Sequence, residues 1–317
     1  MAARYSLICL KLLLFVSLLL FGCRPATPPP SPADLTQVAS TIATRTIPTA
    51  VKPTSVPEEI TAVRNAEYEL GASESLQTVQ LTDGTFERGT SGSDDFLSVT
   101  MTDFTAIGDL NADSVDEVVT LVSENYGGTG VFVFLAVYAQ VDGAWTFQTS
   151  TMVDDRPQLN ALSIEAGEVF LDATIHKADE PMCCPTLKTM RHYRFVDNLL
   201  DMTDYTTFTP EGKPRTISIT SPADGDEVFS SISIKGNVEI APFENSLAYR
   251  IYDVFGVELS AGAIPVTASG VGAPGTFSVM IPLGRALDNA VVRLEVQDIS
   301  AEDGSLLAMD SVELVVK

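Results

Sequence analysis

Short apolar runs separated by turn signals fill residues 61–317 and restrict the fold more than any other feature of the sequence. The dipeptides Asp83-Gly84, Asp142-Gly143 and Ala166-Gly167 each lie between two runs rich in β-branched and aromatic residues. Turns of this kind join neighbouring antiparallel strands. The sequence therefore predicts a mainly β fold. The segment before Asp109 is also compatible with a helix, so an α+β first domain stays open.

Residues 131–138 form a run that is apolar at every position. A strand with this pattern is buried on both faces, so we expect it inside a sheet. The glycine-rich segment before it, residues 126–130, leads into a strand and is not followed by a Lys-Ser/Thr pair. We therefore interpret it as a strand connection and not as a phosphate-binding loop.

Residues 214–317 alternate between apolar and polar positions, with a turn at intervals of roughly ten residues. In a segment of about 100 residues this pattern predicts an immunoglobulin-like β-sandwich. The Cys…Trp…Cys trio of antibody domains is absent from this segment. We expect its strands near residues 216–220, 231–235, 247–252, 275–281, 291–296 and 309–316.

Several motifs of this second domain carry a resemblance. Ile219-Thr-Ser-Pro222, Val228, Ile234-Lys-Gly236, Gly275-Thr-Phe277 and Asp303-Gly-Ser305 resemble the immunoglobulin-like domain of bacterial spore-germination lipoproteins. The resemblance implies an envelope module that serves for spacing or for protein contact.

The N-terminal 22 residues have the pattern of a secretory signal. Arg4 and Lys11 supply positive charge, and residues 12–20 are almost wholly apolar. The alternative is an uncleaved membrane anchor, but a span needs about 20 apolar residues and Lys11 interrupts this run. In both cases the rest of the chain is expected to be extracytoplasmic.

The signal pattern ends in Leu20-Phe21-Gly22-Cys23. This sequence resembles the lipobox of bacterial lipoproteins. The resemblance implies that residues 1–22 are removed and that Cys23 is acylated, which would anchor the protein to the bacterial cell membrane or envelope through lipid.

Residues 23–60 are dominated by proline, threonine, serine and alanine. Such a stretch buries too little apolar surface to offset its conformational entropy, so we expect a disordered tether. About 260 residues follow, which suggests two domains of ordinary size. We place them at residues 61–208 and 214–317.

The chain is strongly acidic, with a formal net charge of −23. Removal of the signal segment takes away Arg4 and Lys11 and no acid, which leaves −25. A surface of this charge repels phosphate backbones, so nucleic acid is not an expected partner. The expected electrostatic partners are metal ions and basic proteins.

Residues 108–117, Gly-Asp-Leu-Asn-Ala-Asp-Ser-Val-Asp-Glu, place oxygen-bearing side chains at alternate positions. This spacing suits a hard cation such as calcium, which takes six to eight oxygen ligands. The segment resembles the calcium loop of FG-GAP repeats, and the resemblance implies four side-chain ligands: Asp109, Asn111, Asp113 and Glu117. Ser114 and Ala112 stand where that family usually or often has glycine. The alternative is an acidic turn that caps its own backbone.

Pro181-Met-Cys183-Cys184-Pro185 contains the only two free thiols expected after processing, because Cys9 is removed with the signal segment and Cys23 is acylated. In an oxidising compartment each has only the other as an intramolecular partner, which favours a strained disulfide between neighbours. Free thiols are a second reading. A metal site with the chain's two histidines, His176 and His192, is a third.

Four segments of the first domain resemble a family of uncharacterised bacterial secreted lipoproteins: Asn65-Ala-Glu-Tyr68, Leu81-Thr-Asp-Gly84, the Gly-Asp-Leu-Asn loop and the Cys-Cys-Pro motif. We find no catalytic constellation. The sequence predicts a non-enzymatic, membrane-anchored envelope lipoprotein with binding or structural β domains, whose partners are envelope proteins or polymers. The alternative is a thiol/histidine-dependent enzyme that uses the region of Cys183 and Cys184.

Overall fold

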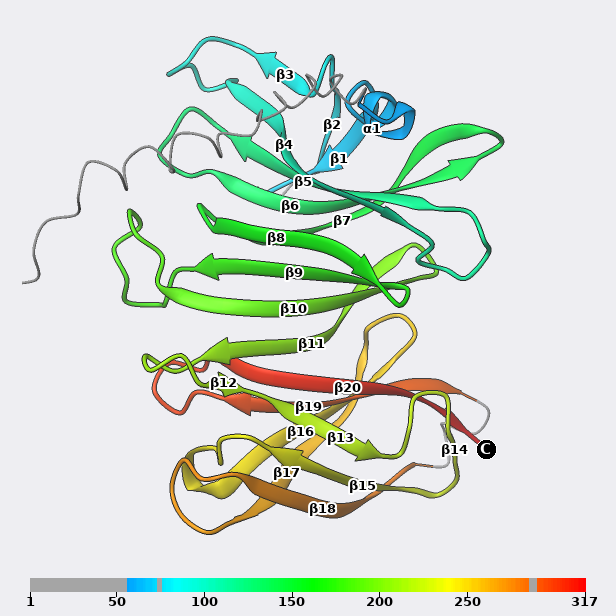
Figure 1. Cartoon of the computed structure of the whole chain (residues 1–317), viewed down its shortest axis with the longest axis vertical. Coiled ribbons are helices and arrows are strands. Elements are labelled where there is room, and N and C mark those ends of the chain that lie inside the picture. The colour runs from blue at the N-terminus through cyan, green and yellow to red at the C-terminus, as the bar shows by residue number, and fades with distance from the viewer. Residues whose placement is uncertain (1–55, 73–75, 285–289) are drawn as a thin grey trace, which may run out of the picture. The chain divides into compact units, whose positions relative to one another are not determined.

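The computed structural model describes residues 56–72, 76–284 and 290–317. Cys23, the signal segment and most of the predicted tether lie outside the described residues. The described part is mainly β, as predicted (Figure 1). No helix within it is long and apolar enough to cross a membrane.

The first half of the described chain contains one helix and eleven strands. In chain order these are α1 (Glu58–Val63), β1 (Glu67–Leu70), β2 (Gln77–Gln80), β3 (Thr85–Arg88), β4 (Leu97–Gly108), β5 (Glu117–Asn125), β6 (Phe132–Val141), β7 (Ala144–Asp155), β8 (Gln158–Glu165), β9 (Glu168–Ile175), β10 (Leu187–Val196) and β11 (Leu199–Phe208).

The second half contains nine strands and one 3-10 turn. They are β12 (Pro214–Arg215), β13 (Ile217–Ser221), β14 (Glu227–Val228), β15 (Ser231–Val238), η1 (Phe243–Asn245), β16 (Ser246–Asp253), β17 (Glu258–Ala268), β18 (Gly275–Pro282), β19 (Val291–Ile299) and β20 (Leu306–Val316).

A five-stranded antiparallel sheet in the order β3-β4-β5-β6-β7 forms the centre of the first half (Figure 1). Its strands β5 and β6 are buried on both faces, which confirms the prediction for residues 131–138. On one face Val118 and Tyr138 pack against α1 and the β1-β2 pair. On the other face Val119 and Leu135 pack against β9 and β10. These strands need apolar residues at successive positions, because each of their two faces packs in a hydrophobic core.

Two of the predicted turns join neighbouring strands as expected. Asp142 and Gly143 connect β6 to β7, and Ala166 and Gly167 connect β8 to β9, all with positive φ. The prediction for Asp83-Gly84 was wrong in part. The turn forms, but the residues on its two sides pair only through the single β-bridge between Thr82 and Thr85. The strand β2 pairs with β1 and the strand β3 pairs with β4.

A long sheet runs through the rest of the structure, in the order β13-β15-β18-β17-β16-β19-β20-β11-β10-β9-β8. The two halves of the chain meet where β11 pairs with β20, through Asp204 opposite Asp310, Tyr205 opposite Met309 and Thr206 opposite Ala308. Residues 55–317 form one compact unit. The division into domains at residues 208 and 214 stays a prediction.

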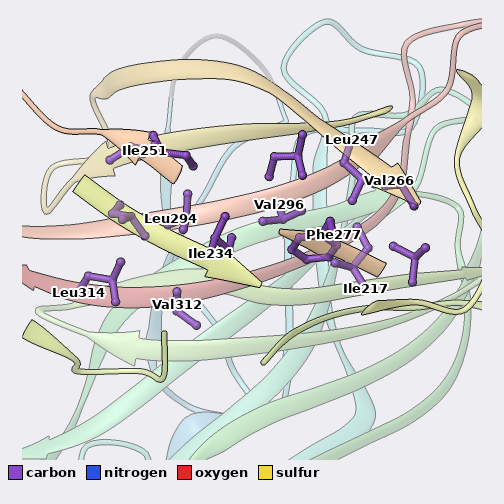
Figure 2. Packing of buried hydrophobic residues seen from close by; sticks show 14 of the residues in the cluster. Ile217, Ile234, Leu247, Ile251, Val266, Phe277, Leu294, Val296, Val312 and Leu314 are labelled. Carbon is purple, nitrogen blue, oxygen red and sulfur yellow. The ribbon is translucent and has the colours of Figure 1, made fainter. Parts of the chain in front are cut away.

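The second half is a β-sandwich, as predicted. One layer contains β13, β15 and β18, and the other contains β16, β19 and β20. Strand β17 pairs with β16 along its first part and with β18 along its last three residues, so it passes from one layer to the other. The apolar residues that alternate along these strands meet in one core, which Figure 2 shows with Ile234, Phe277, Ile251 and Leu294 among its members.

Three details differ from the sequence-based expectations. The helix α1 begins at Glu58, inside the segment expected to be a disordered tether. The segment before Asp109 is the strand β4, so the helical alternative is wrong. Strand β17 was not expected, because it contains many small residues and Pro265, which weaken the strand signal.

Candidate functional site: the acidic loop and the Cys-Cys turn

The predicted calcium loop connects β4 to β5, two adjacent strands of the five-stranded sheet. Gly108 ends β4 and lies opposite Glu117, which begins β5. The sheet therefore fixes both ends of the loop. Glu117 is buried, with 1% of its surface exposed, whereas Asn111 and Asp113 are exposed and Asp109 is half-buried.

The loop side chains accept hydrogen bonds from the loop's own backbone. Asp109 Oδ2 accepts from the Ser114 N–H at 3.0 Å, and Asn111 Oδ1 accepts from the Asp113 N–H at 2.9 Å. Asp113 Oδ1 accepts from the Val115 N–H at 2.7 Å. These are the local turns that Asp and Asn form readily. The self-capping alternative therefore has direct support.

Glu117 lies at the base of the loop and joins two of its residues. Its Oε2 accepts from the Leu110 N–H at 2.7 Å, and its Oε1 accepts from the Asn111 side-chain amide at 3.2 Å. Burial raises the pKa of Glu117, and the nearby charges of Asp113 and Asp109 raise it further. A carboxylate held this way is costly to keep charged unless a cation or more donors balance it.

Two residues of the loop adopt the backbone conformation that favours glycine. Ala112 has φ 62° and Ser114 has φ 69°. These are the positions at which the FG-GAP pattern usually (Ser114) or often (Ala112) has glycine, so here residues with a Cβ adopt the conformation that glycine adopts most easily. A left-handed conformation costs a residue with a Cβ roughly 1–2 kcal/mol.

The residues present meet some requirements of a calcium site. Oxygen ligands from Asp109, Asn111, Asp113 and Glu117 are gathered on one short loop, and Asp109 Oδ1 is shielded from solvent without a hydrogen-bond partner. Against this, the described residues contain no group of three or more Asp, Glu, His or Cys side chains arranged to hold a metal ion. Calcium binding stays a prediction.

Cys183 and Cys184 lie in the connection between β9 and β10. Both are exposed free thiols, with their Sγ atoms 2.7 Å apart. Glu180 organises this connection, because its Oε2 accepts from the N–H groups of Lys177 and Thr186. The predicted disulfide stays a prediction, and the geometry keeps the two sulfur atoms adjacent.

The two histidines do not join the cysteines in a nucleophilic site. His192 Nδ1 lies 3.5 Å from Glu168 Oε2, and its ring packs edge-on against Phe170. Within the described residues no hydrogen bond or ion pair links His176 or His192 to a cysteine sulfur. The hydrogen bond with Cys183 raises the pKa of the Cys184 thiol. A raised pKa lowers the thiolate fraction that a nucleophile needs.

Sequence reasoning missed a group of ionisable residues at the β11–β20 pairing. Asp204 and Asp310 lie directly opposite each other and border a cavity of about 700 Å³ that Glu168, His192 and Arg194 also line. Burial raises the pKa of Asp204 to about 6 and that of Asp310 to about 6. No sequence signal pairs these two acids, because their strands belong to different predicted domains.

Comparison with known proteins finds a match to one part of the chain. Residues 216–305 match the family Gmad2, described as the immunoglobulin-like domain of bacterial spore germination. This is a family of immunoglobulin-like domains and not of enzymes, and its setting suggests an extracytoplasmic protein. No curated protein matches the chain. The second half is thus similar to the spore-germination immunoglobulin-like domain, and its structure is the β-sandwich that such a domain requires.

Proposed function

We propose that this protein is a non-enzymatic envelope lipoprotein, anchored through lipid on Cys23, that presents its β domains to envelope proteins or polymers. The observation that carries the proposal is the match of residues 216–305 to a family of immunoglobulin-like domains, together with the sandwich that these residues form. Immunoglobulin-like sandwiches serve widely as modules for spacing and contact at cell surfaces.

The anchor rests on the sequence. Leu20-Phe21-Gly22-Cys23 follows a short apolar run with positive charge before it, which is the pattern of a signal segment that ends in an acylated cysteine. Two or more acyl chains hold a protein on a membrane stably, whereas a single chain holds it only reversibly. The domains would then work outside the cytoplasm.

Calcium at the loop of residues 109–117 is the second part of the proposal. Its support is the shielded, unpartnered Asp109 Oδ1 and the buried Glu117 carboxylate among several acids. A bound divalent cation would supply the positive charge that these groups lack. Because Glu117 begins β5, a cation there would brace the central sheet.

The anchor is tested by expression of the full chain in a bacterium that processes lipoproteins, with a labelled fatty acid in the medium. We expect label in the membrane fraction for the parent chain and for Cys183→Ala, and no label for Cys23→Ala. Label that survives Cys23→Ala would overturn the assignment of the anchor.

A further inference from the structure

The sheet at the junction of β10, β11 and β12 separates two chemically different faces. Side chains alternate between the faces of a strand. On β11, Asp204 and Thr206 line the acidic cavity, whereas Tyr205 and Thr207 line a second cavity of about 1050 Å³ on the other face. Strand register places Arg191 opposite Tyr205 and Arg215 opposite Thr207. The second cavity therefore contains two arginines on one face of the sheet.

Arg191 is the most deeply buried cation of this cavity, with 5% of its surface exposed. Its Nη1 donates to the carbonyl oxygen of Val153 at 3.0 Å, and its guanidinium lies 5.4 Å from the centre of the Tyr205 ring. Its Nε is shielded from solvent and has no hydrogen-bond partner. Within the described residues it forms no ion pair. A buried arginine is normally paired, because an unpaired buried charge is costly.

His176 adds further unpartnered atoms to the same cavity. Both of its ring nitrogens are shielded from solvent without a partner, and at least one of them carries a hydrogen. His176 and Arg191 both approach the end of β7: the His176 backbone N–H donates to Asp154, next to the Val153 carbonyl that Arg191 binds. Buried polar groups are normally satisfied, so three unsatisfied nitrogen atoms around one cavity require an explanation.

The charges around the cavity leave Arg191 without a carboxylate partner in the described part of the chain, whereas Arg215 lies near the buried Asp298. Burial raises the pKa of Asp298, and the charge of Arg215 offsets part of that rise. Lys177 pairs with Glu180 and Lys188 pairs with Asp172, each at 3.7 Å. The acids that line the cavity, Asp179, Glu302 and Asp303, are exposed and form no ion pair with either arginine in the described part of the chain. In a protein of net charge −23, a cavity with a buried arginine that forms no ion pair within the described residues is unusual.

We propose that this cavity binds an organic carboxylate, with Arg191 as the residue that holds the anion. The Nη1 bond to Val153 leaves the shielded Nε without a protein partner, and the Nε edge of a guanidinium matches the two oxygens of a carboxylate. His176 and Arg215 supply further donors. The site goes beyond the proposed anchoring and presenting role, since it gives the protein a ligand of its own.

The walls of the cavity favour a monoanion with an apolar or ring-shaped body. Met152, Ile175 and Met202 line it, together with the rings of Tyr193 and Tyr205. Its volume is that of a pocket for a small molecule or for one unit of a polymer. The three exposed acids of the lining and the acidic chain disfavour a doubly charged phosphate more than a carboxylate.

The test is a calorimetric titration of the full chain with sodium benzoate and sodium glucuronate, each compared with its neutral counterpart, benzyl alcohol or glucose. Sodium chloride at equal ionic strength is the blank, and inorganic phosphate is a further arm. We expect at least one carboxylate to bind, with its neutral counterpart at least about tenfold weaker, because a charge-assisted pair of hydrogen bonds is lost.

Three variants assign the binding to Arg191. Arg191→Gln should weaken carboxylate binding about tenfold or more, and Arg215→Gln, which leaves the Val153 bond intact, should weaken it several-fold. Arg250→Gln removes an arginine that is paired with Glu258 elsewhere, so binding should be unchanged. The proposal is overturned if neither carboxylate binds, if phosphate alone binds, or if folded Arg191→Gln and Arg215→Gln both bind like the parent.

Discussion

At the residue scale, the loop between β4 and β5 combines two roles that the sequence could not separate. Asp109, Asn111 and Asp113 cap backbone N–H groups, yet each carboxylate or amide oxygen that caps the loop has a second lone pair. Capping and cation binding are therefore compatible. A loop that only caps its own backbone gains no stability from calcium, whereas a loop that also binds the cation does.

We predict that calcium raises the melting temperature of the parent chain and that Asp109→Asn loses this gain. At about 100 times its dissociation constant, a ligand that binds only the folded state adds roughly 2.7 kcal/mol. For a unit of this size that corresponds to about 5–10 °C. Asparagine keeps the oxygen that accepts from Ser114 and removes the charge, so differential scanning calorimetry with calcium and with chelator isolates the cation effect.

Asp116→Asn is the matched control for this experiment. Asp116 is exposed and has the same charge in the same loop, but it accepts no hydrogen bond within the described residues. The variant should keep most of the calcium-dependent shift. Equal loss in both variants would mean that calcium responds only to the net charge of the loop, and no shift in the parent chain would leave a self-capped turn.

At the element scale, the pairing of β11 with β20 brings two carboxylates together where the halves of the chain meet. Asp204 and Asp310 lie opposite each other, with Glu168 and His192 beside them. Like charges opposite one another destabilise a strand pair. The backbone N–H groups of Ile219 and Ser311 donate to Asp310, which lessens this cost in part.

We predict that this pairing makes the protein more stable in mild acid. The pKa of each acid rises from 3.8 to about 6 on folding, chiefly because burial disfavours the charged form. The folded state therefore binds these protons more tightly than the unfolded state. The resulting stability is complete below about pH 4 and is lost as the pH rises to about 6, a change of about 1–3 kcal/mol for each acid.

Thermal melts between pH 4 and pH 7.5 test this prediction. Asp204→Asn should be more stable than the parent chain at pH 7 and should depend less on pH between 4 and 6. Asp103→Asn, which changes an exposed acid on β4, should follow the parent curve. A parent-like pH dependence in Asp204→Asn would contradict the account of the junction.

The sequence predicted those elements whose signals are local. The alternation along β13, β15 and β18 and the positive-φ turns at Asp142-Gly143 and Ala166-Gly167 depend on neighbouring residues, so the pattern was sufficient. Which strands pair with each other depends on residues that are far apart in the sequence. For that reason the sequence predicted a longer hairpin at Asp83-Gly84, where Gly84 N–H in fact donates to Arg64 O at the end of α1.

The same distinction holds for the candidate sites. The turns of the acidic loop could be predicted, because its Asp and Asn residues stand at every second position and each can accept a hydrogen bond from the backbone two residues on. The arginine cavity could not be predicted from the sequence. Arg191 and Arg215 come together only through the register of β10, β11 and β12, and in sequence they are ordinary charged residues of β strands.

At the scale of the whole molecule, the chain combines a strongly acidic composition with a mainly β structure and an immunoglobulin-like second half. The acidic surface disfavours polyanionic partners such as nucleic acids. The thiol/histidine alternative is not favoured, because the histidines contact Glu168 and the end of β7 and not the cysteines. These properties agree with a protein that works by contact outside the cytoplasm.

The most direct measurement of this account is the intact mass of the protein purified from the membranes of a lipoprotein-processing bacterium, with and without alkylation before denaturation. We predict a chain that begins at Cys23 and carries acyl groups. From the predicted disulfide between Cys183 and Cys184 we also expect no alkyl adduct. An unacylated chain, or one that still begins at Met1, would contradict the account. Two alkyl adducts would keep the anchor but refute the disulfide.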